Sequence, residues 1–281
     1  MAPFLFYTKM INVNTTISIL GCGWYGLPLA KKLVELRYNV KGSTTTSEKV
    51  FKLKESGIIP YIVDFQEESE HFDSDFFDTD LLIICIPPKR STAEQGSFTK
   101  KITKIISASE QKVKNIIFIS STSVYGDYNT HMNEFSTPIP DSPSGKAMLA
   151  AETILKDNNY FKTTIIRFAG LIGPDRDPGR FFAGKTNIPN GLAPINLIIL
   201  DDCINLILKI IELKAFGYIY NACIPDHPSK QSFYTKASEN SGLAIPDFIN
   251  ELNQWKIIDS QNVPELLNYQ YSISKWSDWL A

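Results

Sequence analysis

Three glycines near the start of the chain have the spacing that binds a dinucleotide phosphate. Gly21, Gly23 and Gly26 form a G-x-G-x-x-G pattern between a predicted strand and a predicted helix. The first glycine permits a tight turn, the second lets the backbone approach a pyrophosphate, and the third lets the helix pack on the strand. The helix N-terminus offers the phosphates a positive dipole. The loop, which contains Trp24 and Tyr25, therefore predicts dinucleotide binding, with three ordinary turn glycines as the alternative.

The segment at the end of the second predicted strand bears on the choice between NAD and NADP. Proteins that bind NAD usually place an Asp or Glu about 20 residues beyond the glycines, where it holds the ribose 2′-OH. No acidic residue lies between Glu35 and Glu48 here. Hydroxyl groups and a lysine suit a 2′-phosphate better, so the sequence predicts NADP in preference to NAD, with a plain polar loop as the alternative. The predicted contacts are Ser43, Thr44, Thr45 and Lys49.

Other predicted strand ends complete the expected cofactor contacts. Asp64 ends the segment "IPYIVD" and is expected either to accept a hydrogen bond from the adenine amino group or to cap a loop. Ile86 and Pro87 lie at the end of the apolar run "LLIICIPP", and Ser120 ends the strand "NIIFIS". We expect Ile86, Pro87 and Ser120 to line the cofactor, and Asp64 as well unless it caps the loop.

A loop rich in proline and glycine carries the basic residues Arg176, Arg180 and Lys185 in "GPDRDPGRFFAGK". Arginine and lysine bind phosphate and carboxylate groups through charge-assisted hydrogen bonds. The loop therefore predicts contacts with a phosphorylated or acidic substrate, with a solvated basic loop as the alternative.

Cysteines and histidines are too scattered to predict a metal site. No CxxC spacing occurs, the three histidines are equally scattered, and no cluster of metal ligands is present in the sequence. Reduced thiols are expected. The residues concerned are Cys22, Cys85, Cys203, Cys223, His71, His131 and His227.

Strand-like and helix-like segments alternate along the chain, which indicates an α/β fold. Buried apolar runs predict parallel strands, and right-handed helical crossovers then join them into a Rossmann-like doubly wound sheet of about seven strands. The chain is expected to be a single unit with two parts. The dinucleotide-binding part is expected to comprise about residues 14–173 and 201–223, and a small C-terminal substrate-binding part about residues 174–200 and 224–281.

Composition limits the classes of function. The net charge of -2 over 281 residues argues against a nucleic-acid partner, because phosphate backbones require clustered Lys and Arg. No apolar run approaches the roughly 18 residues of a membrane span, so no membrane partner is expected. Residues 1–10 carry neither a basic region nor a cleavage pattern, so we expect no signal peptide and a cytoplasmic protein.

Three further segments resemble the extended short-chain dehydrogenase/reductase family, the NAD(P)-dependent epimerases and dehydratases of nucleotide-sugars. "IIFISSTSVYGD" resembles the strand that carries the family's catalytic Ser or Thr and its "VYG" signature. "IIRFAGLIGPDRDPGRF" is similar to its "R-x-x-x-x-Y-G-P-G" segment, and "APINLIILDDC" is similar to its "V-N-x-I-H-V-x-D" element. The G-x-G-x-x-G spacing departs from the family's usual G-x-x-G-x-x-G. Together with "STSVYG", it resembles the atypical YeeZ-like subgroup.

In that family a Ser or Thr, a Tyr and a Lys four residues later act together. The Tyr is the acid/base, and the Lys lowers its pKa from the same helix face. The resemblance gives Ser121 the Ser/Thr position. Matching "SPSGKAMLAAE" to the family's "SPYGxSKLAAE" places Ser144 opposite the Tyr and Met148 opposite the Lys.

A second register places Ser142 opposite the Tyr and Lys146 opposite the Lys, but it breaks the match at Gly145 and Glu152. Neither register gives a tyrosine, so the family's dyad is absent. A nearby phenol is Tyr125 of "VYG", whose ring more often packs than reacts.

Two functions therefore remain open. The first is an NAD(P)-dependent oxidoreductase or epimerase-like enzyme acting on an unknown, nucleotide-sugar-like or other small molecule. Its non-standard acid/base would be found among Ser121, Tyr125, Ser144 and Lys146. The second is a catalytically silent dinucleotide-binding sensor.

The family resemblance also implies a homodimer. Family members often pair through two helices of each subunit, here 98–109 and the helix that follows Ser144. The apolar residues Met148, Ala151 and Leu155 can serve either the core or this interface.

Overall fold

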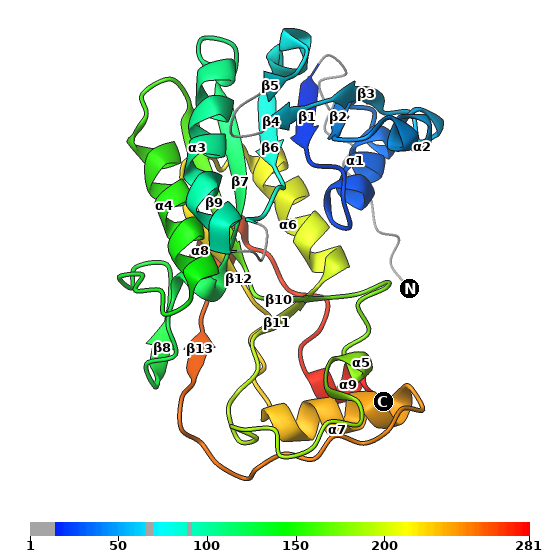
Figure 1. Ribbon diagram of the computed structural model, residues 1–281, viewed down its shortest axis with the longest axis vertical. Coiled ribbons are helices and arrows are strands. Elements are labelled where there is room, and N and C mark those ends of the chain that lie inside the picture. The colour runs from blue at the N-terminus through cyan, green and yellow to red at the C-terminus, as the bar shows by residue number, and fades with distance from the viewer. Residues whose placement is uncertain (1–14, 66–69, 89–91) are drawn as a thin grey trace, which may run out of the picture. The chain divides into compact units, whose positions relative to one another are not determined.

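A computed structural model describes residues 15–65, 70–88 and 92–281, so the N-terminal segment tested for a signal peptide lies outside the described residues. Seven parallel strands form one sheet in the order β12-β9-β7-β6-β1-β2-β3, and the predicted Rossmann-like fold is confirmed (Figure 1). The strand order reverses between β1 and β6, the kind of point at which such sheets bind ligands. The strands are β1 (Thr16–Leu20), β2 (Asn39–Thr44), β3 (Ile59–Ile62), β6 (Leu81–Ile84), β7 (Asn115–Ser121), β9 (Lys162–Phe168) and β12 (Ile219–Ala222).

The chain divides into two compact units. Unit 1 extends to Ile86 and includes Lys100–Ile117 and Asn158–Lys162. Unit 2 comprises Pro87–Thr99, Phe118–Asp157 and Thr163–Ala281. The division into a dinucleotide-binding and a substrate-binding part stays a prediction, because compactness does not show what a unit binds.

Unit 1 is built around β1, which pairs in parallel with β2 and with β6. Ile17 and Ile19 of β1 are fully buried, as are Leu29 and Leu33 of the first helix, because the helix presents one apolar face to the sheet. The other elements are α1 (Gly26–Glu35), α2 (Val50–Glu55), β4 (Asp64–Phe65) and β5 (Glu70–His71).

Unit 2 contains two further parallel strand pairs, β10 with β11 and β8 with β13. Their bounds are β8 (Thr130–Met132), β10 (Gly170–Ile172), β11 (Leu197–Ile199) and β13 (Lys256–Ile258). The helices that follow or precede them are α4 (Pro143–Asp157), α5 (Gly179–Phe182), α6 (Leu200–Leu213), α7 (Lys230–Asn240), α8 (Asn262–Leu267) and α9 (Trp276–Trp279). The helix α3 (Thr92–Ser109) has residues in both units.

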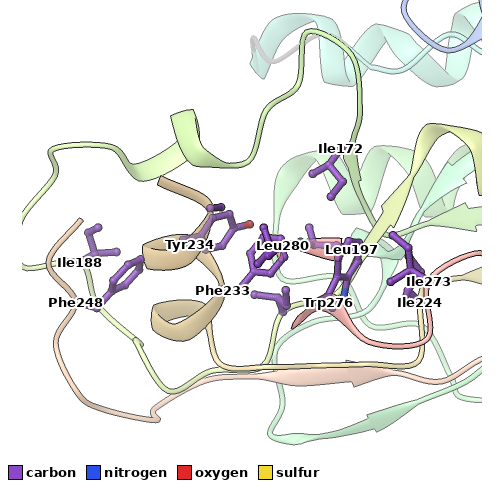
Figure 2. Close-up of a cluster of buried hydrophobic side chains, with 12 residues drawn as sticks. Ile172, Ile188, Leu197, Ile224, Phe233, Tyr234, Phe248, Ile273, Trp276 and Leu280 are labelled. Atoms are coloured by element: carbon purple, nitrogen blue, oxygen red, sulfur yellow. The ribbon is translucent and has the colours of Figure 1, made fainter. Parts of the chain in front are cut away.

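The C-terminal segments of unit 2 have an apolar core of their own (Figure 2). Phe233 of α7 and Trp276 of α9 lie at its centre, with ring centroids 5.3 Å apart. The buried carboxylate of Asp202 holds the chain that leads into α9, because it accepts hydrogen bonds from the Tyr269 hydroxyl (2.6 Å) and the Ser272 N–H (3.0 Å). The loops of this region are therefore packed around a defined centre.

No helix in the described part of the chain is long and apolar enough to cross a membrane.

Candidate functional site

Two glycines of the loop after β1 are required by the protein's own packing. Gly21 has a φ of +101°, and a Cβ there would lie 2.8 Å from Cγ2 of Ile86. A Cβ on Gly26 would lie 2.2 Å from the carbonyl oxygen of Gly21, so only glycine lets α1 begin this close to the loop. These contacts fix the turn between β1 and α1.

Gly23 is different, because a Cβ on it would meet no described atom within 4 Å. Its φ is not positive, so the backbone does not demand glycine there either. In a G-x-G-x-x-G loop this is the position at which the backbone approaches a pyrophosphate. The first turn of α1 carries no acidic residue, so no carboxylate opposes an anion at the positive end of the helix dipole. The loop thus fits a dinucleotide.

The hydroxyl-rich end of β2 divides into a buried and an exposed part. Ser43 is 2% exposed, and its Oγ accepts a hydrogen bond of 2.8 Å from the N–H of Gly21. Thr44 is also buried. Thr45 and Lys49 are exposed. Ser43 therefore stabilises the glycine loop. The solvent-exposed side chains, Thr45 and Lys49, come after the end of β2.

The remaining predicted cofactor contacts vary in exposure. Ile86 is half-buried beside Gly21, whereas Tyr25 is buried and Trp24 is half-buried. Asp64 lies at the start of β4 and is half-buried. Pro87 is exposed and belongs to unit 2. The structure thus brings Gly21, Ser43 and Ile86 together in unit 1.

In unit 2, α4 begins where the family's catalytic helix is expected. The N–H of Gly145 donates a hydrogen bond of 3.2 Å to the Ser142 Oγ, which caps the first turn. A Cβ on Gly145 would lie 2.1 Å from the carbonyl oxygen of Ser123, so glycine lets the helix pack directly on the turn η3 (Thr122–Val124). This glycine supports the first of the two registers, in which it matches the motif.

Ser144 and Met148 are the residues that the first register matches to the family's Tyr and Lys. Ser144 is half-buried, and Met148 is 5% exposed and packs in the core. Lys146 is exposed. A neutral serine hydroxyl and a thioether cannot replace a phenol whose pKa is lowered by an ammonium group.

A buried ion pair anchors the other end of the motif. The Arg167 guanidinium on β9 donates two hydrogen bonds to the Glu152 carboxylate on α4, Nε to Oε1 at 3.0 Å and Nη2 to Oε2 at 2.6 Å. Both side chains are almost fully buried. The Ser120 hydroxyl donates to the same carboxylate at 2.5 Å. Burial alone would lower the pKa of Arg167. The hydrogen bonds and ion pair with Glu152 outweigh this effect, so the pKa is raised.

Tyr125 joins this buried network. Its side chain is 0% exposed, and its hydroxyl accepts a hydrogen bond of 2.5 Å from Nη1 of Arg167. The same hydroxyl lies 2.8 Å from the carbonyl oxygen of Asn133 and 3.2 Å from Oδ1 of Asn221, the two acceptors for its one proton. Burial is the main cause that raises the pKa of Tyr125. A sealed phenol with a raised pKa is poorly suited to proton transfer with a substrate.

Ser121 is half-buried and caps η3, because its Oγ accepts a hydrogen bond of 3.1 Å from the Ser123 N–H. Its hydroxyl proton takes no part in that contact. Among the candidate catalytic residues, Ser121, Ser144 and Lys146 therefore retain accessible polar groups, while Tyr125 does not.

The basic loop residues are exposed. Arg180 is 80% exposed at its side chain and lies 3.7 Å from Asp177, a contact of little energetic value. Nζ of Lys185 donates to the carbonyl oxygen of Phe181 at 3.0 Å. Arg176 is exposed. A solvated basic loop and a substrate-contacting loop remain alternatives.

Two sets of polar contacts in unit 2 were missed in the sequence. The pair Glu152–Arg167 carried a signal, since an arginine inside the apolar strand "TTIIRF" must find a buried anion. Lys256 was not noticed, although Nζ donates to the Tyr125 carbonyl oxygen at 2.7 Å and lies 2.8 Å from the Asp127 carboxylate. No local pattern links residues 125–127 with residue 256, because only the tertiary fold brings them together.

Comparisons with known proteins agree with this geometry. Residues 94–221 match the NAD dependent epimerase/dehydratase family. The chain is 36% identical over 262 residues to Protein YeeZ of Escherichia coli K12, covering 91% of this chain and 95% of that protein. UDP-glucuronic acid 4-epimerase from Bacillus cereus in complex with NAD has a similar fold, with a TM-score of 0.77 and 21% identity over 95% of this chain and 96% of that one. A functionally unknown conserved protein from Silicibacter pomeroyi DSS gives a TM-score of 0.77 at 19% identity, covering 95% and 97% of the two chains.

Proposed function

The chain belongs to the NAD-dependent epimerase/dehydratase family, and from that premise we propose that it binds a nicotinamide dinucleotide and transforms a small molecule without the Tyr–Lys dyad. The proposal rests on the difference between two kinds of residue in the α4 motif, those that pack and those at the reactive positions. The motif's packing residues Gly145 and Glu152 are engaged, whereas Ser144 and Met148 occupy the two reactive positions. The cofactor would supply hydride transfer, and the protein would supply binding, orientation and a different proton donor or acceptor.

The loop after β1 supports cofactor binding. Gly23 leaves space on the side where a pyrophosphate approaches, while Gly21 and Gly26 fix the turn. Relatives described as epimerases are named in complex with NAD, among them the UDP-glucuronic acid 4-epimerase from Bacillus cereus. Binding of NAD(H) or NADP(H) by this chain is therefore the first element of the proposal.

NADP(H) is the proposed preference. No carboxylate lies between Glu35 and Glu48, and the exposed Thr45 and Lys49 follow β2. A hydroxyl and an ammonium group can hold a 2′-phosphate, which an Asp in this place would repel. Ser43 is less suited to this contact, because its hydroxyl is buried and engaged by Gly21.

The proton donor or acceptor is proposed among Ser121, Ser144 and Lys146. Lys146 is exposed and the two serines are half-buried, so none of the three is sealed from solvent. The full burial of Tyr125, the fourth candidate, and its three polar neighbours argue against it as the proton donor or acceptor. The substrate class is proposed to be a small molecule of nucleotide-sugar or similar type, contacted by Arg176, Arg180 or Lys185.

Binding without turnover is the second candidate function. It is favoured by the burial of Met148, at the position matched to the family's Lys, and by the burial of the Tyr125 phenol. Both candidates predict bound cofactor, and hydride exchange separates them.

The experiment is mass spectrometry of the small molecules that the purified protein retains, followed by incubation with deuterium-labelled forms of any ligand found. Deuterium appearing in the nicotinamide supports the enzyme, and retained cofactor with no exchange supports the silent binder. Absence of any retained or added nicotinamide dinucleotide would remove both.

A homodimer and a cytoplasmic location stay proposals. Met148, Ala151 and Leu155 are buried within the chain itself, so a dimer through α4 would have to use other side chains. Sedimentation at micromolar concentration tests the dimer, and a monomer there would contradict it.

A further inference from the structure

The turn η3 supports two of the candidate proton donors. Ser121 caps the start of the turn, because its Oγ accepts a hydrogen bond of 3.1 Å from the Ser123 N–H. The first turn of α4 packs on the same segment, since a Cβ on Gly145 would lie 2.1 Å from the carbonyl oxygen of Ser123. Ser144 directly precedes Gly145. The position of η3 therefore determines the position of Ser121 and of the helix start that bears Ser144.

Lys256 holds the other end of this turn from a distant part of the chain. Its Nζ donates a hydrogen bond of 2.7 Å to the carbonyl oxygen of Tyr125, the residue at which η3 ends. The side chain of Lys256 is 15% exposed, so the ammonium group is largely removed from water. A hydrogen bond from a charged donor is stronger than one between neutral groups. This single contact therefore fixes the C-terminal end of the turn.

Acidic groups compensate the charge of this lysine. The Asp127 carboxylate lies 2.8 Å from Nζ of Lys256, and the Asp127 N–H donates to the Asp141 carboxylate at 2.9 Å. The Asp127 side chain is 45% exposed and Asp141 is exposed, so water screens both carboxylates. The contact with Tyr125, by contrast, is made at a fully buried residue. The hydrogen bond to the carbonyl group, more than the ion pair, is therefore the contact that holds the turn.

The backbone of Lys256 is itself held in place. The Asn196 side-chain amide donates to the carbonyl oxygen of Lys256 at 2.9 Å and accepts from the Ile258 N–H at 2.8 Å. The Asn253 N–H donates to Oδ1 of Asn190 at 2.7 Å. Both asparagines belong to the loop that follows the predicted substrate-contacting residues. The segment that carries Lys256 is thus fixed to this loop, and its side chain connects the loop to η3.

From this arrangement we propose that Lys256 is a positioning residue, which orients Ser121 and the start of α4 by holding the C-terminal end of η3. The proposal rests on the proposed function, in which Ser121 or Ser144 exchanges a proton with the substrate. Lys256 acts through the turn and does not contact the reacting atoms. Its effect on the rate can still be large, because a displacement of about 1 Å can cost on the order of 100-fold in catalysis.

The first test is amide hydrogen exchange, followed by NMR in the full-length protein without ligand. Lys256→Met should raise the exchange rates of the Ser123 and Tyr125 amides about tenfold or more, because the turn opens more readily without the charged contact. Lys256→Arg should restore slow exchange, since a guanidinium group can donate to the same carbonyl oxygen. The matched control is Lys209→Met, which removes a lysine that pairs with Glu212 on α6 and should leave both amides unchanged.

Three results of this test would overturn the proposal. They are unchanged exchange of the two amides in Lys256→Met, an equal rise in Lys209→Met, and a rise spread evenly over unit 2 that Lys256→Arg does not reverse. The last would indicate general destabilisation. If Lys256→Met does not fold, Lys256→Gln replaces it, and a smaller rise at the same two amides is expected, because a neutral donor remains.

The second test links the turn to the chemistry through deuterium transfer from a labelled ligand to the nicotinamide. Lys256→Met should lower the transfer rate about tenfold or more and leave the affinity for NADP(H) unchanged, since the glycine loop belongs to unit 1. An unchanged transfer rate despite faster exchange at Ser123 would contradict a positioning role. A parent protein that binds cofactor but transfers no deuterium would refute the proposed enzyme, while the exchange measurement still decides whether Lys256 holds the turn.

Discussion

The glycine loop of unit 1 and the start of α4 in unit 2 each resemble a motif of the family. The two resemblances differ in which kinds of residue are retained. In the loop, Gly21 and Gly26 meet the protein's packing needs, whereas no packing need explains Gly23, which we propose faces the pyrophosphate of the cofactor. In α4, Gly145 and Glu152 also meet packing needs, but Ser144 and Met148 stand where the ligand-directed groups are expected. On this proposal the loop keeps residues of both kinds, whereas the helix keeps only those that pack.

This difference distinguishes two reasons why a residue belongs to a sequence motif. Residues that hold backbone against backbone, such as Gly145 against Ser123, are needed for the fold whatever the protein does. Residues that act on a ligand are not required by the packing, and Met148, at the position matched to the family's Lys, packs in the core instead. A family match therefore supports the fold and the cofactor more directly than it supports the chemistry.

The largest expected effect comes from breaking the anchor of α4. Glu152→Gln removes the charge that pairs with the buried Arg167 guanidinium, and the free energy of unfolding should fall by about 3–5 kcal/mol. Urea unfolding measures this. The matched control is Glu35→Gln, which breaks an exposed ion pair with Lys32 and should change stability by less than about 1 kcal/mol. Equal effects of the two substitutions would show that the buried pair does not anchor the helix.

The next effect concerns the loop. Gly23→Val should leave the fold intact, because no described atom lies within 4 Å of the added Cβ, yet it should weaken NADP(H) binding at least about 100-fold. Gly26→Ala should instead destabilise the protein, since its Cβ would collide with the Gly21 carbonyl oxygen. Calorimetry and thermal unfolding of both variants separate the two roles. Undiminished cofactor affinity in Gly23→Val would remove the loop from the binding site.

A smaller effect tests cofactor preference. Ser43→Asp would bury a carboxylate and break the contact with Gly21, so the exposed Thr45 is the better position. Thr45→Asp should repel the 2′-phosphate and shift the ratio of NADP(H) to NAD(H) affinity by about tenfold toward NAD(H). The parent protein should favour NADP(H). Equal affinities in the parent, or no shift in the variant, would contradict the preference.

The sequence predicted the sheet and the glycine loop because both depend on local patterns. Apolar strands and the G-x-G-x-x-G spacing are contiguous in sequence, and the fold adds the contacts of Gly21 with Ile86 and Ser43. The burial of Ser43 could not be predicted, since it depends on how β2 lies beside the loop. The same is true of Tyr125, whose partners Asn133, Arg167 and Asn221 come from separate segments.

The packing of Gly145 on Ser123 agrees with the register that matches this glycine to the family motif, and the register itself stays a prediction. What the sequence left open was whether Met148 faces the core or an interface. Its exposure of 5% within the chain answers this, because the helix presents that face to the interior.

The central claim, a bound nicotinamide without the family's Tyr–Lys chemistry, is tested most directly by turnover. The parent protein, Ser144→Ala and Lys146→Ala are incubated with NADP⁺ and a panel of nucleotide-sugars, and the absorbance of reduced nicotinamide is followed. General acid–base catalysis supplies typically 10²–10⁴-fold, so the parent should fall short of a dyad-bearing family member by about that factor. A residual rate that is lost in Ser144→Ala or in Lys146→Ala, with the fold intact, would identify that residue as the proton donor or acceptor. Turnover of the parent protein at the rate of a dyad-bearing family member would contradict the account.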